Sequence, residues 1–204
     1  MKIKSGVPEV VGVFELNPPE FQYCVYLPIL VDKVFYIPEK YSWVELLIEN
    51  FKESDLENFK YCYLTVKYMF VEGYTNRRGW HIDGFLTDDV NYIWCDVLPT
   101  FFSVGEFDLT EDHEKSLKEM EYQSLDNMLV HALEGELRRL DNTNVHCCAV
   151  ADEPTIRKFV KLSLSNSIYN LEGNAINPLI DNSLFSNKLK RDNHRNHPVK
   201  TKSK

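Results

Sequence analysis

Apolar and polar side chains alternate along several stretches of the chain, which is the pattern of β-strands with one buried face. Gly, Pro, Asn and Asp bound most of these stretches, as expected for the turns between strands. The pattern predicts eight short strands, at residues 10–16, 22–31, 61–71, 91–97, 100–104, 136–140, 144–150 and 156–165.

Two other segments place their apolar residues at a helical spacing. In residues 42–51, Trp43 and Leu47 fall on one helix face, because residues four apart lie one above the other. Residues 110–133 show a similar spacing, and Thr110 is the expected N-cap because acidic residues follow it in the first turn. We therefore expect two helices among the strands.

The order of these elements indicates the fold class. Many strands, few helices and no regular alternation of the two argue against a parallel, doubly wound sheet. We expect a mainly β protein with flanking helices, a double-stranded β-helix of the jelly-roll, cupin-like type. With 204 residues and no internal repeat, the chain is predicted to form one domain over residues 1–180, followed by a basic, disordered tail at residues 181–204.

Charge is distributed unevenly along the chain. The net charge is −8, yet residues 183–204 carry seven basic side chains and one acidic side chain. An acidic body is a poor general nucleic-acid binder. The tail is expected to be solvated, and contact with the phosphates of a nucleic acid is the alternative.

The cysteines and the apolar runs bear on the compartment. The five cysteines form no CxxC pair and no regular spacing, so neither a disulfide framework nor a cysteine-rich zinc site is indicated. No segment resembles a signal peptide, and no apolar run reaches the roughly 18 residues of a membrane span. We expect a cytoplasmic protein with no membrane partner.

The segment with the most chemical information contains His81 and Asp83. Residues two apart on a strand point to the same side, so the imidazole and the carboxylate would project together and Ile82 would face away. Such a pair alone is close to what chance supplies. For the pair alone, a histidine hydrogen-bonded to a carboxylate at a turn is the better interpretation.

Two later segments make a metal site the better interpretation. His146 lies in a strand-like run 63 residues after Asp83, and two histidines with one carboxylate can form a facial triad that leaves coordination positions of iron(II) open. Arg157 and Lys161 follow on one face of the next strand, whose other face is apolar except at Lys158. Two cations beside a metal suit an anionic ligand.

The His-x-Asp pair, the distal histidine and an arginine about ten residues beyond it resemble the iron(II)/2-oxoglutarate-dependent oxygenase superfamily. These motif segments fall within residues 61–165, a little over half of the chain. Residues 78–94 are also similar to uncharacterised phage-encoded proteins, for which the compartment would be the host cytoplasm.

The resemblance implies a role for each of these residues. His81, Asp83 and His146 would bind iron(II). Arg157 would hold the distal carboxylate of 2-oxoglutarate, and Lys161 would assist it or meet an anionic substrate. The implied cofactors are iron(II), 2-oxoglutarate as co-substrate and dioxygen. The implied activity is hydroxylation or oxidative demethylation, with release of succinate and carbon dioxide.

The identity of the substrate is open at this point. A small molecule, a protein side chain and a nucleobase all fit the motif. Trp80, Tyr92 and Trp94 are candidate substrate contacts, but with 13% aromatic residues in the chain we expect at least two of them in the core.

Two features depart from the superfamily pattern. A long acidic helical insertion separates Asp83 from His146, and Cys147 and Cys148 adjoin the distal histidine. A thiolate could bind iron, but small core residues are the expected explanation of the pair.

Two functions other than an oxygenase are compatible with these residues. The main alternative is a non-catalytic jelly-roll protein, such as a phage accessory protein, that keeps a metal site and binds or inhibits a partner. A cupin-type isomerase ranks last, because those sites usually draw on more histidines. The chain contains no GxxxxGKS/T, GxGxxG, HExxH or GxSxG motif, so phosphate-loop, dinucleotide, zincin and serine-hydrolase functions have no local support.

Overall fold

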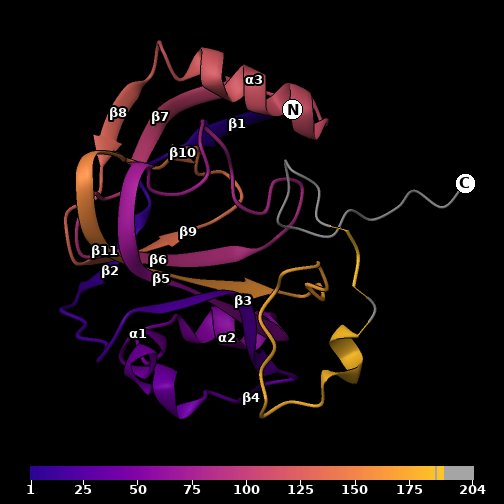
Figure 1. Cartoon of the computed structure of the whole chain (residues 1–204). Helices are drawn as coiled ribbons and strands as arrows, with labels where there is room; N and C mark the ends of the chain where they lie inside the picture. Colours follow the sequence, from indigo (N-terminus) through magenta and orange to yellow (C-terminus); the bar gives the residue numbers. More distant parts are fainter. Residues whose placement is uncertain (187, 191–204) are drawn as a thin grey trace, which may run out of the picture.

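Two curved antiparallel sheets face one another in this computed structural model, which describes residues 1–186 and 188–190 (Figure 1). The strands are β1 (Lys2–Ser5), β2 (Glu9–Val13), β3 (Gln22–Val31), β4 (Val34–Phe35), β5 (Tyr61–Tyr74), β6 (Val90–Cys95), β7 (Phe101–Asp108), β8 (Met128–His131), β9 (Glu136–Leu140), β10 (His146–Cys147) and β11 (Val150–Ser165). The helices are the 3-10 helix η1 (Glu39–Val44), α1 (Glu45–Ile48), α2 (Glu53–Asn58), α3 (His113–Gln123) and the 3-10 helix η2 (Asn182–Phe185).

The topology is that of a double-stranded β-helix. The large sheet has the order β2-β9-β6-β11-β5-β3-β4, and the small sheet has the order β1-β7-β10 with β8 paired to β7. The two longest strands, β5 and β11, pair in antiparallel fashion along almost their whole length. The predicted fold class, mainly β with flanking helices, is therefore confirmed.

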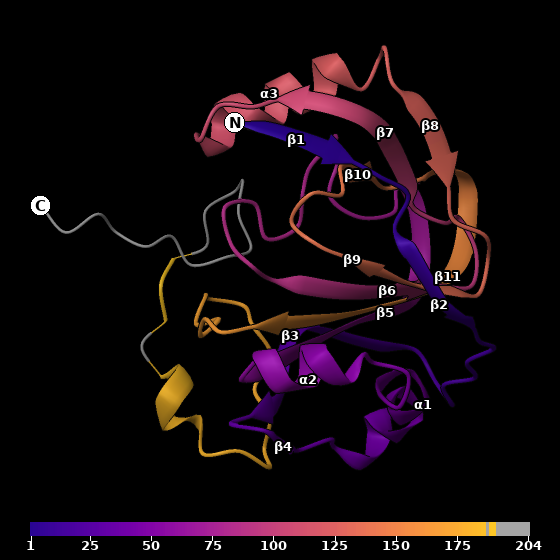
Figure 2. The same ribbon diagram turned by 180° about the vertical axis from the view of Figure 1, so that it is seen from behind.

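The two faces of the large sheet have different roles. On β11, Val160, Leu162 and Leu164 point to the outer face, where they join the main hydrophobic core beneath the first helices. Figure 2 shows α1 and α2 covering this face on the side away from the small sheet. Lys161 points to the inner face, between the sheets, as the alternation of side chains along a strand requires.

The predicted helix at residues 110–133 is wrong in its length and its cap. The helix α3 ends at Gln123, and Asp112 caps it by accepting hydrogen bonds from the backbone N–H groups of Glu114 and Lys115, 3.1 and 2.9 Å long. Residues 128–131 form strand β8 instead, paired to β7. The helical spacing of the apolar residues gave a wrong prediction here. Leu125, Met128 and Leu129 are exposed, so their spacing does not correspond to a buried face of a helix.

A buried carboxylate joins the helical layer to the large sheet. Asp55 of α2 accepts hydrogen bonds from the Tyr92 hydroxyl at 2.7 Å and from Nε and Nη2 of Arg139 at 2.6 and 2.8 Å. Burial alone would raise the pKa of Asp55, but the bonds from Arg139 and Tyr92 and the charge of Arg139 hold it below its usual value. This network fixes α2 on β6 and β9.

The chain continues to pack against the body after residue 180. Phe185 of η2 is buried and meets the ring of Tyr63 edge to face, with 6.4 Å between ring centroids. The rest of the predicted basic tail, residue 187 and residues 191–204, lies outside the described residues. Within the part of the chain that the structure describes, no helix has the length and apolar character needed to cross a membrane.

Candidate metal centre

The backbone sets the two histidines directly opposite each other. His81 and His146 form an isolated antiparallel bridge, in which each backbone N–H donates to the other's carbonyl oxygen at 2.9 Å. His146 begins β10 and pairs with Phe102 of β7. The strand geometry assumed for His81 and Asp83 does not hold, because only His81 forms a bridge and Asp83 lies in the turn that follows.

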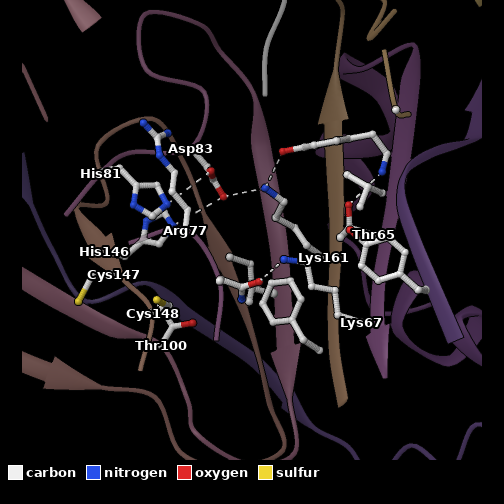
Figure 3. A pocket seen from close by; sticks show the side chains of 17 residues that line it. Thr65, Lys67, Arg77, His81, Asp83, Thr100, His146, Cys147, Cys148 and Lys161 are labelled. Atoms are coloured by element: carbon white, nitrogen blue, oxygen red, sulfur yellow. Dashed lines mark hydrogen bonds and ion pairs between the residues drawn. The ribbon is translucent and has the colours of Figure 1, made fainter. Parts of the chain in front are cut away.

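The turn nevertheless brings the carboxylate to the two imidazoles. Nε2 of His81 lies 4.0 Å from Oδ1 of Asp83, and Nε2 of His146 lies 3.6 Å from Oδ2. The three ligand atoms all lie within 4.8 Å of one another, and Figure 3 shows the three side chains pointing toward a shared point. The structure thus brings His81, Asp83 and His146 together, as the sequence predicted.

Hydrogen bonds fix which nitrogen of each ring faces this point. Nδ1 of His81 lies 2.8 Å from the carbonyl oxygen of Gly79, and Nδ1 of His146 lies 3.0 Å from that of Asn144. A carbonyl oxygen can only accept, so each Nδ1 carries the proton and each Nε2 presents its lone pair. Metal-bound histidines in proteins are oriented in this way.

The charge states also fit a divalent metal ion. Burial and the neighbouring imidazole of His146 lower the pKa of His81 to about 3, so its ring is neutral at pH 7. Burial alone would raise the pKa of Asp83, but the ammonium of Lys161 holds it well below its usual range. Two imidazole nitrogens and one carboxylate oxygen form the donor set of a facial triad.

The three residues lie at one wall of a cavity between the sheets, with a volume of about 320 Å³. This volume is within the range of roughly 300–1,000 Å³ that is usual for small-ligand sites. The cavity is lined by Tyr23, Val25, Tyr26, Thr65, Lys67, Asn76, Arg77, His81, Asp83, Ile93, Thr100, His146, Cys147, Cys148, Phe159, Lys161 and Gly173 (Figure 3).

Lys161 is one of three cations in this lining. Its Nζ donates to Oδ2 of Asp83 at 3.0 Å and to the hydroxyl of Tyr26 at 3.1 Å. Lys67 and Arg77 are the other two, and the sequence reasoning missed both. Lys67 could have been found from the sequence. It follows Thr65 by two positions in an otherwise apolar run, so both side chains lie on the same face of the strand, and both line the cavity.

Arg157 is not among the cavity-lining residues. Its side chain is buried, and Nε and Nη2 donate to the carbonyl oxygens of Val97 and Leu98 at 3.0 and 3.1 Å. Its role as the anchor for 2-oxoglutarate stays a prediction. The cations that the cavity itself presents are Lys67, Arg77 and Lys161.

The three aromatic candidates for substrate contact also lie outside the cavity lining. Tyr92 and Trp94 belong to the main core, where Tyr92 stacks on Phe51 with ring centroids 4.1 Å apart. Trp80 packs against a separate apolar cluster. The expected core position thus holds for Tyr92 and Trp94.

The adjacent cysteines line the cavity, so the expectation that they fill the core is corrected. Burial and the neighbouring Cys148 raise the pKa of the Cys147 thiol to about 12, which leaves it protonated at neutral pH. Among the described residues, the group of possible metal ligands contains His81, Asp83 and His146 and no cysteine.

No family model matches the chain, and neither does any curated protein. Three solved structures are similar at low identity. AviO1 from Streptomyces viridochromogenes Tue57 has 14% identity and a TM-score of 0.41 over 75% of this chain and 72% of that chain. EvdMO1 has 15% identity and a TM-score of 0.37 over 72% of this chain and 39% of that chain.

The third similar structure is EvdO2 from Micromonospora carbonacea var. aurantiaca, complexed with 2-oxoglutarate. It has 11% identity and a TM-score of 0.37 over 88% of this chain and 82% of that chain. At these TM-scores, the likenesses carry no inference about the chemistry of this chain.

Proposed function

We propose that this protein is an iron(II)- and 2-oxoglutarate-dependent oxygenase. The observation that carries the proposal is the convergence of His81, His146 and Asp83 at the wall of a cavity that also contains three cationic side chains. Two imidazole nitrogens and one carboxylate leave three positions on iron(II), enough for a chelating 2-oxo acid and dioxygen. The cations suit the carboxylates of that acid.

The site residues would have different roles in binding the metal ion. Nε2 of each histidine and a carboxylate oxygen of Asp83 would hold the metal ion. Lys161 keeps Asp83 charged and oriented through its 3.0 Å bond. When bound, iron(II) would supply the redox chemistry that couples decarboxylation of 2-oxoglutarate by dioxygen to oxidation of a substrate. The enclosing sheets would limit the access of water to these groups.

The direct test is an anaerobic titration of the full chain with iron(II) and 2-oxoglutarate. Chelation of iron(II) by a 2-oxo acid generally gives a visible metal-to-ligand charge-transfer band. We expect this band to appear and to saturate at one 2-oxoglutarate per chain. Its absence at millimolar 2-oxoglutarate would contradict the proposal. Succinate formation on admitting air then separates an enzyme from a metal-binding protein without catalysis.

The choice of carboxylate anchor can be tested with the same band. We propose that Lys67 binds the distal carboxylate, because it faces the cavity beside the hydroxyl of Thr65. Loss of a charge-assisted hydrogen bond typically weakens binding roughly 10- to 100-fold. We therefore expect Lys67→Met to raise the Kd for 2-oxoglutarate by that factor.

Arg157→Met is the matched comparison, because it removes a cation of the neighbouring strand that lies outside the cavity lining. It leaves the carbonyl oxygens of Val97 and Leu98 without a donor, so its Tm should fall while the Kd for 2-oxoglutarate stays near that of the wild type. A rise in Kd for Arg157→Met but not for Lys67→Met would assign the anchor to Arg157.

A further inference from the structure

The charge inside the cavity is opposite to that of the protein. The whole chain has a net charge of −8, but the cavity lining contains Lys67, Arg77 and Lys161 against the single carboxylate of Asp83. A cavity with three cationic side chains and one carboxylate, inside an acidic protein, is arranged to admit anions.

Only Lys161 has a counter-charge in the lining. Its Nζ is bonded to Asp83, as described above. Lys67 donates to the amide oxygen of Asn76 at 2.7 Å, which satisfies a donor without neutralising the charge. Burial and the nearby charges of Lys161 and Arg157 lower the pKa of Lys67 to about 8, as expected for a cation that lacks an anion.

Arg77 has the less satisfied side chain of the two. Within residues 1–186 and 188–190, its guanidinium makes no hydrogen bond and no ion pair, although it is half-buried and its charge acts on His81. In Figure 3, Arg77 lies on the side of the cavity that holds His81, on which its charge acts, whereas Lys67 lies on the side of Lys161. The two cations therefore serve different parts of the cavity.

The co-substrate can use one of these two cations. Of the two carboxylates of 2-oxoglutarate, one would help to chelate the metal and the other would bind the ammonium of Lys67. A guanidinium next to the metal ligands is then left without an anion. Its planar fork matches a carboxylate or phosphate group in a bidentate contact.

We propose that the substrate of this protein carries a carboxylate or phosphate group and that Arg77 binds that group beside the metal; this inference rests on the proposed function. An uncharged substrate would leave the Arg77 guanidinium partly desolvated and unpaired in the complex, which is unfavourable. An anionic substrate replaces the lost hydration with two charge-assisted hydrogen bonds.

The chain offers a matched control. Arg78 follows Arg77 directly, but it is exposed, lies over the ring of Tyr74 at 5.1 Å and is absent from the cavity lining. Arg77→Gln and Arg78→Gln thus remove the same charge from adjacent positions, and only the first changes the cavity.

The binding test uses the full chain loaded with zinc(II) and saturated with 2-oxoglutarate, so that no turnover occurs. Ligand-detected NMR follows methyl phosphate, propionate and the neutral isostere propionamide. We expect saturable binding of at least one of the two anions and none of propionamide. The anion that binds more tightly identifies phosphate or carboxylate as the recognised group.

The two variants decide whether Arg77 carries this binding. We expect Arg77→Gln to weaken anion binding about tenfold or more and Arg78→Gln to leave it within about twofold. Absence of saturable anion binding, equal binding of propionamide, or equal losses in both variants would overturn the inference.

The charge-transfer titration separates the two proposals. For Arg77→Gln we expect a Kd for 2-oxoglutarate within about twofold of the wild type, since Lys67 is retained. A selective loss of 2-oxoglutarate affinity would make Arg77 the co-substrate anchor, which overturns the inference and leaves the proposed function intact. If the wild type gives no band, the proposed function and the inference built on it both fail.

Discussion

Asp83→Ala is expected to abolish tight metal binding and to destabilise the protein at the same time. The substitution removes the only carboxylate among the three candidate ligands. It also leaves the Lys161 ammonium, 8% exposed, without its anionic partner. Loss of one partner of a buried ion pair costs about 3–5 kcal/mol of unfolding free energy. Metal affinity can be measured by titration with iron(II) or zinc(II), and stability by urea denaturation of the metal-free protein.

A double variant separates the two effects. Asp83→Ala with Lys161→Met removes both charges, so the metal-free protein should regain most of the lost stability. It should still fail to bind metal, because the third ligand is missing. If the double variant binds metal as tightly as the wild type, Asp83 is not a ligand. If metal-free Asp83→Ala is as stable as the wild type, the ion pair with Lys161 contributes no stability.

Asp55→Ala should give the largest loss of stability outside the metal centre. The variant leaves Arg139 without its carboxylate and the buried Tyr92 hydroxyl without its acceptor. We expect a loss of about 3–5 kcal/mol in unfolding free energy at pH 7, measured by urea denaturation. Asp126→Ala, at an exposed position, is the control and should change stability by less than about 0.5 kcal/mol.

The same carboxylate predicts a dependence on pH. The folded protein holds the pKa of Asp55 below its usual value, so its stabilising effect is fully present above that value. The effect is lost as the pH falls through the lowered pKa of the folded state. The stability gap between the wild type and Asp55→Ala should therefore shrink below about pH 4. A gap that stays constant down to pH 2 would contradict this linkage.

Strands with clear alternation and turn residues at both ends could be predicted from the sequence. β3 and β9 have the predicted bounds, 22–31 and 136–140, because each run is flanked by residues that end a strand. β8 was missed, because its exposed apolar residues follow α3 at a spacing that also suits a helix.

The candidate site was predictable where residue type alone limits the chemistry. His81 and Asp83 became a candidate site only together with His146, but the approach of the three residues depends on the bridge between His81 and His146, which no local pattern reveals. Arg157 shows the opposite case. Its alternation places it on the correct face, yet the carbonyl oxygens of Val97 and Leu98 determine where its guanidinium lies. Sequence spacing carries no information on such loop contacts.

The alternation along β11 also bears on how this protein can change over generations. Val160 and Leu162 secure the sheet to its helices, whereas the alternating positions Phe159 and Lys161 face the ligand space. A substitution at an inward position therefore changes the ligand space while the packing of Val160 and Leu162 on the helices stays intact. On β11, the residues that stabilise the fold and the residues that face the ligand space thus lie on opposite sides of the strand.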